Sequence, residues 1–147
     1  MSDPLYRNDL LRLAADAHGA GRLVESDASG HAFNPACGDR VTVDISMKTG
    51  HIAEFAHDTK ACVLTQASAS ILGSALRGVD RAGVFELRAQ VAAMFAAGGQ
   101  PPARPFEAYA VFQGAIKYES RHRCVLLPID AVLDALQQSV VTDETST

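Results

Sequence analysis

Three cysteines and one aspartate are the side chains of this chain best suited to bind a metal or to attack sulfur. Cys37 and Asp39 lie two residues apart in a Gly- and Pro-containing loop, residues 34–40, which precedes an alternating strand pattern. The other two cysteines are Cys62 and Cys124. Because thiolates bind soft metals and a carboxylate can complete such a site, we predict that the four side chains converge on one metal or cluster site.

The alternative is that the three cysteines are separate and inert. Free cysteine is among the most buried residue types and often only fills space in a core. No CxxC pair is present, which disfavours a zinc ribbon or a thioredoxin-like redox site. His122, two residues before Cys124, is the best histidine candidate for a ligand. The remaining histidines are predicted to be solvated or half-packed, namely His18, His31, His51 and His57.

Each cysteine is predicted to lie at the boundary of a secondary-structure element. Cys37 precedes a strand, Cys62 begins a helix rich in small residues, and Cys124 lies just before the last helix. The free N–H groups and the dipole at a helix N-terminus stabilise a thiolate. We therefore expect Cys62, and also Cys124, to be more acidic than a free thiol.

Length and composition favour one globular domain over residues 1–147. The hydrophobic content is 48% and the net charge is −4, with both signs interspersed. A nucleic-acid-binding protein would show a basic stripe, so binding to nucleic acid is not expected. Neither a secretory signal nor a membrane-spanning apolar run is evident, which predicts a cytoplasmic protein without membrane contact. In that compartment three cysteines are expected to be reduced ligands or nucleophiles.

The first half of the chain carries the strand patterns. Residues 5–18 predict a helix, and residues 22–33 predict one or two short strands. Residues 40–47 alternate, so one face is expected to be buried and the other, which includes Asp44, to be exposed. Residues 51–57 form the returning strand of a hairpin, whose less regular pattern indicates a bulge or cover on both faces.

The second half carries the helix patterns. A helix is predicted from Cys62 to Leu76 with Asp58 or Thr59 as its cap, and another from Asp80 to the break at residues 98–102. A short helix at residues 106–114 and a polar loop at residues 117–123 follow. The last helix is predicted from residue 126 or 128 to residue 138, with Pro128 in its first turn and a disordered tail over residues 142–147. Strands before helices indicate an α+β fold, with an antiparallel sheet and helices packed on one face.

Two motifs resemble a known family. Residues 34–40 (Asn-Pro-Ala-Cys-Gly-Asp-Arg), followed by a hairpin, and residues 61–70 (Ala-Cys-Val-Leu-Thr-Gln-Ala-Ser-Ala-Ser) resemble the IscU/NifU N-terminal scaffold family of iron–sulfur cluster assembly. A helical insertion between the second and third cysteines, about residues 80–106, resembles the SufU-type branch. The resemblance spans about residues 5–136 and includes the third motif, with Gly114, Lys117, Tyr118, Arg121 and Cys124.

The resemblance implies a three-stranded antiparallel sheet and one exposed site formed by Cys37, Asp39, Cys62 and Cys124. SufU-type proteins hold Zn²⁺ there and accept persulfide sulfur from a cysteine desulfurase. IscU-type proteins assemble a [2Fe–2S] cluster on these ligands and pass it to acceptor apo-proteins. By the same resemblance Cys124 is the expected sulfur acceptor, and Arg121 is expected to stabilise its thiolate.

Some residues depart from the family pattern. Arg123 stands where IscU-type proteins carry a histidine, which favours Asp39 over His122 as the fourth ligand. Residues 119–123 replace the segment that a dedicated Hsp70 chaperone recognises, so that partner is not expected. We therefore favour zinc-dependent sulfur transfer with a SufS- or IscS-like desulfurase, in which the protein is at most a sulfurtransferase-like accessory. The alternatives are a [2Fe–2S] scaffold and a simple store of iron or zinc.

Overall fold

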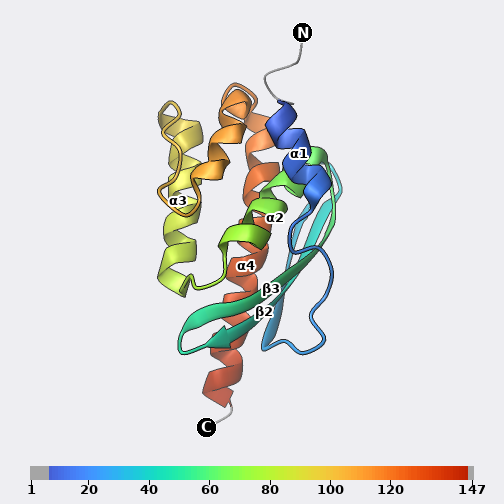
Figure 1. Ribbon diagram of the computed structural model, residues 1–147, viewed down its shortest axis with the longest axis vertical. Coiled ribbons are helices and arrows are strands. Elements are labelled where there is room, and N and C mark those ends of the chain that lie inside the picture. The colour runs from blue at the N-terminus through green and yellow to red at the C-terminus, as the bar shows by residue number, and fades with distance from the viewer. Residues whose placement is uncertain (1–6, 146–147) are drawn as a thin grey trace.

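The computed structural model describes residues 7–145 and has the predicted α+β architecture, with a three-stranded antiparallel sheet and helices on one face (Figure 1). The strands lie in chain order and are β1 (Ala28–Asn34), β2 (Asp39–Lys48) and β3 (His51–Lys60). The helices are α1 (Asn8–Asp16), α2 (Val63–Ala75), α3 (Arg81–Ala97), the 3-10 helix η2 (Glu107–Ala115) and α4 (Glu119–Thr145). Within this part of the chain, no helix is both long enough and apolar enough to span a membrane.

The β2–β3 hairpin confirms the strand patterns and the predicted bulge. Val41, Val43 and Ile45 on β2 are at most 1% exposed and face the helices. The pairing register between β2 and β3 shifts after Ser46. Ser46 faces Glu54, but the next residue, Met47, faces Ile52. One residue of β3, residue 53, is therefore extra, and this explains why the alternation along β3 is irregular. Residues 22–33 contribute one strand, β1, and not two.

Asp44 corrects the prediction that the second face of β2 is solvated, since it is only 1% exposed. Its carboxylate accepts hydrogen bonds from Nε and Nη2 of Arg22, at 2.7 and 3.0 Å, and from the backbone N–H of Leu23. The hydroxyl of Ser29 also donates to it. The segment that precedes β1 therefore covers this face, and a buried carboxylate is acceptable there because its oxygens are fully paired.

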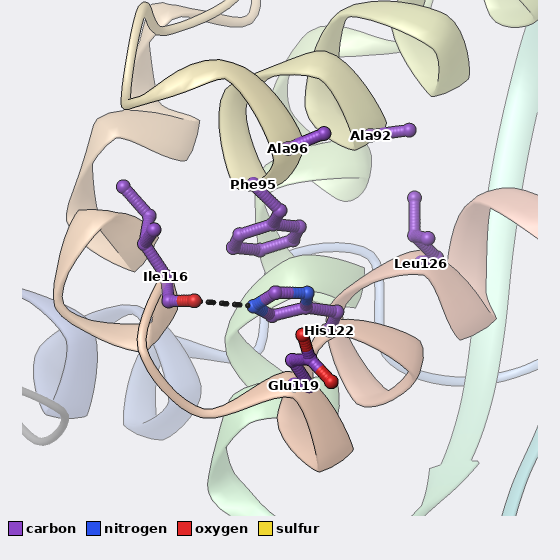
Figure 2. Close-up of a pocket in the computed structure, with 7 residues that line it drawn as sticks. All are labelled: Ala92, Phe95, Ala96, Ile116, Glu119, His122 and Leu126. Atoms are coloured by element: carbon purple, nitrogen blue, oxygen red, sulfur yellow. Dashed lines mark hydrogen bonds between the residues drawn. The ribbon is translucent and has the colours of Figure 1, made fainter.

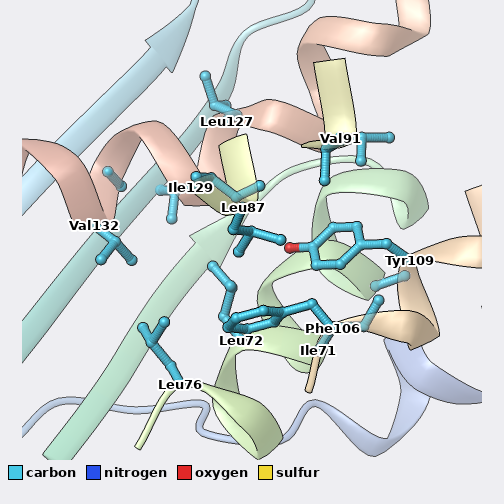
Figure 3. Close-up of a cluster of buried hydrophobic side chains, with 14 of the residues drawn as sticks. Ile71, Leu72, Leu76, Leu87, Val91, Phe106, Tyr109, Leu127, Ile129 and Val132 are labelled. Carbon is cyan, nitrogen blue, oxygen red and sulfur yellow. The ribbon is translucent and has the colours of Figure 1, made fainter. Parts of the chain in front are cut away.

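The core lies between the sheet and helices α2 and α4. Helix α1 packs against α2, while α3 lies on the side of α4 away from the sheet (Figure 1). Figure 3 shows apolar side chains of α2, α3, η2 and α4 meeting in one cluster, among them Leu72, Leu87, Tyr109 and Ile129. The α3 residues predicted to be buried by helical spacing are buried, namely Val84, Leu87, Val91, Met94 and Phe95.

Gly30 allows β1 to lie directly on α4. A Cβ atom at this position would lie 2.1 Å from the carbonyl oxygen of Ala131 and 2.4 Å from the backbone nitrogen of Ala135. Real Cβ atoms do not approach backbone so closely, so any side chain here would separate the strand from the helix. The backbone N–H of His31, next along β1, donates to Asp134 on α4 at 2.9 Å, which fixes the same contact.

Helix α4 corrects the prediction for the last third of the chain. It begins at Glu119, so residues 119–123 are helical and not a loop, and it continues to Thr145, through part of the predicted disordered tail. Pro128 is consequently inside the helix and not in its first turn. A proline there removes one backbone N–H, which leaves the carbonyl of residue 124 without its usual helical partner.

Helix α2 also begins differently from the prediction. Its N-cap is Cys62, whose side chain makes no capping hydrogen bond, and not Asp58 or Thr59. Those two residues belong to β3, which is longer than predicted and ends at Lys60. The short link between β3 and α2 therefore consists of Ala61 and Cys62, and it places the second thiol at the end of the sheet.

Candidate metal centre

The loop between β1 and β2 is shaped by Asn34. Asn34 pairs with Asp39 at the end of the two strands, so the residues between them form a tight connection. The side-chain oxygen of Asn34 accepts from the N–H of Ala36, and its backbone carbonyl accepts from the N–H groups of Cys37 and Gly38. Gly38 has φ +77°, a left-handed conformation that suits glycine. This network fixes Cys37, which is exposed, above the end of the sheet.

Cys37, Asp39 and Cys124 form a compact group of possible ligands. One sulfur or carboxylate oxygen atom from each lies within 4.8 Å of the others. Asp39 is the first residue of β2, whereas Cys124 is in the second turn of α4, so the sheet and the last helix bring them together. The prediction that residues distant in sequence converge here is therefore supported by the geometry of these three.

Cys62 borders this group from the N-terminus of α2. Its backbone N–H donates to Oδ1 of Asp39 at 3.2 Å, and its sulfur lies 3.5 Å from Oγ1 of Thr65. It is half-buried, while Cys37 is exposed and Cys124 is buried. Cys62 is not one of the residues whose ligand atoms all lie within 4.8 Å of one another, so it lies at the edge of the group of Cys37, Asp39 and Cys124. Three sulfurs and a carboxylate oxygen are ligands that tetrahedral Zn²⁺ accepts, so this donor set fits such a metal.

Asp39 is the hard ligand among soft ones, and its surroundings favour the charged form. Burial raises the pKa of its carboxyl group. Hydrogen bonds from the side chains of Thr65, Cys62 and Cys37 and from the backbone of Cys62 together lower it by more, so the net pKa is below its usual value. An ionised carboxylate is the form that binds a cation. It is 5% exposed and yet adjacent to the exposed Cys37.

Cys124 does not have the acidity predicted for it. Because α4 begins five residues earlier, its thiol is inside the helix and receives no help from the helix N-terminus. Burial, together with the smaller effects of the neighbouring Cys62, Cys37 and Asp39, raises its pKa to about 12. A thiol crowded by other anions ionises only when a positive charge is supplied, which a bound metal ion would do.

Arg121 and His122 lie on α4 just before Cys124. Arg121 is three residues before Cys124 and is half-buried, whereas Cys124 is buried. His122 lines a cavity of about 400 Å³ between α3 and α4 (Figure 2). Its ring stacks on Phe95 with centroids 4.1 Å apart, and Nε2 donates to the carbonyls of Ala115 and Ile116. His122 is therefore engaged elsewhere and is not part of this group.

His57 corrects the prediction that it is solvated or half-packed. It is 2% exposed, with Nε2 donating to the carbonyl of His18 and Nδ1 accepting from the hydroxyl of Thr59. Burial lowers the pKa of its ring, against smaller opposing effects of the His18 carbonyl and Asp58. Its contacts join β3 to the segment after α1, so it has a structural place and lies outside the ligand group.

Thr65 is the site residue that the sequence analysis missed. It is completely buried, and its hydroxyl lies 2.9 Å from Oδ2 of Asp39 and 3.0 Å from the carbonyl oxygen of Cys124. In the sequence it is one residue of a stripe of small side chains on α2. A hydroxyl in a buried stripe needs a partner, and this requirement is the signal that could have drawn attention to it.

Comparisons with known proteins agree on one fold and one family. The family model described as the NifU-like N terminal domain matches residues 5–125. The solved structure of a NifU-like protein (N-terminal) from Brucella abortus has a TM-score of 0.89 and 32% identity, covering 95% of this chain and 96% of that one. A candidate iron–sulfur cluster assembly scaffold of the SUF system from Fervidobacterium islandicum AW-1 shares the fold, with a TM-score of 0.82 and 20% identity, covering 92% and 99%. No curated protein matches the chain.

Proposed function

The chain belongs to the NifU-like N-terminal domain family, and on this premise we propose that it is an iron–sulfur cluster assembly protein that binds Zn²⁺ and accepts sulfur from a cysteine desulfurase. The proposed ligands are Cys37, Asp39, Cys62 and Cys124. The observation that carries the proposal is the grouping of Cys37, Asp39 and Cys124 within 4.8 Å, with Cys62 bound through its backbone to Asp39.

The protein's own residues divide the work of such a site. The Asn34 network holds Cys37 at the surface, and the N-terminus of α2 holds Asp39 through the N–H of Cys62. A bound Zn²⁺ would supply the positive charge that keeps the thiols ionised. Asp39 is the weakest ligand for a soft site, so it is the proposed point at which the site opens.

Sulfur transfer to Cys124 is a thiol–persulfide exchange. The Cys124 thiolate attacks the terminal sulfur of the desulfurase persulfide, a new S–S bond forms, and the desulfurase cysteine leaves as a thiolate. The reaction consumes no oxidant, because one S–S bond replaces another. Since Cys124 is 1% exposed, loop residues 35–38 must move before a donor reaches it. Arg121 is proposed to stabilise the exposed thiolate.

The test is persulfide turnover by a cysteine desulfurase, of the Suf or Isc kind, with and without this protein. We expect the protein to stimulate turnover, and Cys124→Ala to abolish the stimulation. A matched control is Asp130→Asn, which lies on α4 away from the site and pairs with Arg88. If the wild type gives no stimulation, or if Cys124→Ala stimulates equally, sulfur transfer through Cys124 is wrong.

A second candidate function is a scaffold for a [2Fe–2S] cluster, bound as cargo on the same ligands. The exposure of Cys37 on a loop favours it, since a cluster that is handed to an acceptor apo-protein must be accessible. Anaerobic reconstitution with iron and sulfide, followed by visible absorption, distinguishes the two. Zinc in the freshly purified protein and no cluster after reconstitution support sulfur transfer. A stable cluster that passes to an acceptor supports the scaffold.

A further inference from the structure

Thr65 is a buried residue of α2 that contacts several of the proposed ligands. It is in the first turn of α2, three residues after Cys62, and is 0% exposed. Its hydroxyl lies 2.9 Å from a carboxylate oxygen of Asp39 and 3.0 Å from the backbone carbonyl of Cys124, and the sulfur of Cys62 is 3.5 Å away. One buried hydroxyl therefore touches three of the four proposed ligands.

The contact with Cys124 follows from Pro128. In a regular helix the carbonyl of residue 124 accepts from the N–H of residue 128, and proline has no N–H to give. A buried carbonyl without a partner is costly, and Thr65 is the donor placed against this one. The proline in α4 thus creates an acceptor beside the third cysteine that a neighbouring helix satisfies.

The hydroxyl of Thr65 carries one hydrogen, and two acceptors lie within hydrogen-bond distance of it, namely the Asp39 carboxylate and the Cys124 carbonyl. Both acceptors are held close to the same oxygen, which fixes the distance between the start of β2 and the second turn of α4. The carboxylate cannot rotate away without losing this donor and that of the Cys62 N–H. Residues that orient a metal ligand in this way commonly change metal affinity by about 10- to 100-fold when they are removed.

We propose that Thr65 is a positioning residue of this site, whose hydroxyl ties the Asp39 carboxylate to the backbone of Cys124 and thereby slows the release of the bound metal. The inference rests on the proposed function in that Cys37, Asp39, Cys62 and Cys124 must bind a metal. It goes further by assigning the retention of that metal to a residue that is not itself a ligand.

The experiment measures the rate at which Zn²⁺ passes from the loaded full-length protein to an excess of a coloured chelator. Thr65→Val keeps the shape of the side chain and removes the hydroxyl, so we expect release about 10- to 100-fold faster than in the wild type. Thr65→Ser restores the donor and should release Zn²⁺ at close to the wild-type rate. Equal release rates for Thr65→Val and the wild type overturn the proposal.

A matched control separates positioning from general loosening of the helix contact. Ser68, one turn further along α2, is also 0% exposed and donates to the carbonyl of Val125 at 2.7 Å, but contacts no ligand side chain. Ser68→Ala should lower the thermal midpoint of the apo-protein, as Thr65→Val does, without accelerating release. If Ser68→Ala accelerates release equally, the effect belongs to helix packing and the proposal is wrong.

The remaining outcomes are also decisive. Should Thr65→Val not fold, Thr65→Ala and Thr65→Ser replace it, because both lose the methyl group and only serine keeps the hydroxyl. Faster release from alanine than from serine supports the proposal, and equal release contradicts it. If the wild type binds no Zn²⁺, the proposed zinc site fails and the inference fails with it. If the wild type binds Zn²⁺ and the variants release it equally, only the inference fails.

Discussion

The sulfur atoms of Cys37 and Cys124 lie within 4.8 Å of each other, although the first residue is exposed and the second is buried. This pairing arises because a surface loop closes over a helix whose thiol faces inwards. Two cysteines of one proposed site are therefore expected to differ sharply in chemical reactivity whenever no metal is bound.

We predict that iodoacetamide modifies Cys37 first, Cys62 next and Cys124 last in the metal-free protein. Burial excludes the reagent from Cys124 and raises its pKa to about 12, so its thiolate is scarce, and we expect Cys37 to react at least about tenfold faster. Peptide mass spectrometry over a time course measures the three rates. Modification in denaturant is the control, in which the rates should converge. Equal rates in the native protein would contradict the closed arrangement.

We expect the buried carboxylate of Asp44 to make a contribution to stability that depends on pH. Hydrogen bonding to Arg22 lowers the pKa of the Asp44 carboxyl group, and burial opposes this effect. With the further hydrogen bonds from Ser29 and Leu23, the pKa falls from 3.8 to about 2. The folded state therefore binds the proton more weakly than the unfolded state, and the stabilisation is present above about pH 4 and lost as the pH falls towards 2. Asp44→Asn should lower the free energy of unfolding by about 1–3 kcal/mol at pH 7.

Urea denaturation of the wild type and Asp44→Asn at several pH values tests this. The difference between them should shrink as the pH falls through the range from 4 to 2. Glu54→Gln, an exposed carboxylate on the neighbouring strand, is the control and should leave stability unchanged. A difference that stays constant down to pH 2 would show that Asp44 is not the titrating group.

His57 predicts a second dependence on pH, at a higher value. Burial lowers the pKa of its ring below the ordinary value of 6.5, so the unfolded state binds the proton more readily. Stability is then full above about pH 6.5 and decreases as the pH falls below it. The thermal midpoint of the wild type should fall between pH 7 and pH 5, and His57→Gln should flatten this slope, whereas the exposed His51→Gln should not. An unchanged slope in His57→Gln would refute the assignment.

Gly30 predicts the cost of separating β1 from α4. Gly30→Ala places a methyl group where backbone atoms of Ala131 and Ala135 already lie, and neither atom can rotate away. We expect a loss of at least about 1–3 kcal/mol in the free energy of unfolding, measured with urea. Gly83→Ala is the comparison, because its new methyl group meets chiefly the movable side chain of Val79. If both variants are equally stable, the close contact of strand and helix is wrong.

The sequence was most informative where a pattern depends on local spacing. The alternation of Val41, Val43 and Ile45 and the helical spacing of Val84, Leu87 and Val91 both predicted burial correctly, because each period matches its element. The motif around Cys37 and Asp39 lies at the end of the sheet to which Cys124 is also close. Its shape, however, depends on Asn34, whose hydrogen bonds to the loop are visible only in three dimensions.

The sequence was least informative where a local rule is overridden by a distant partner. Pro128 reads as the start of a helix, since a proline inside a helix loses a hydrogen bond. The structure accommodates it because Thr65, 63 positions earlier in the chain, donates to the carbonyl that the proline leaves unpaired. In the same way, Asp44 reads as a solvated side chain until Arg22 is found beside it.

This compensation can be measured with a double-mutant cycle. Pro128→Ala restores the N–H of residue 128, so the carbonyl of Cys124 regains a partner within α4 and no longer depends on Thr65. Thr65→Val should then destabilise the apo-protein less in the Pro128→Ala background than in the wild type, by about 0.5–1.5 kcal/mol, the usual net value of one hydrogen bond. Urea denaturation of the four proteins gives this coupling energy.

Ser68→Ala, combined with Pro128→Ala, is the control, because Ser68 donates to the carbonyl of Val125, whose helical partner Ile129 keeps its N–H. Additive effects of Thr65→Val and Pro128→Ala would mean that the Thr65 hydroxyl stabilises the protein only through Asp39. The proposed link between the Asp39 carboxylate and the backbone of Cys124 would then be wrong.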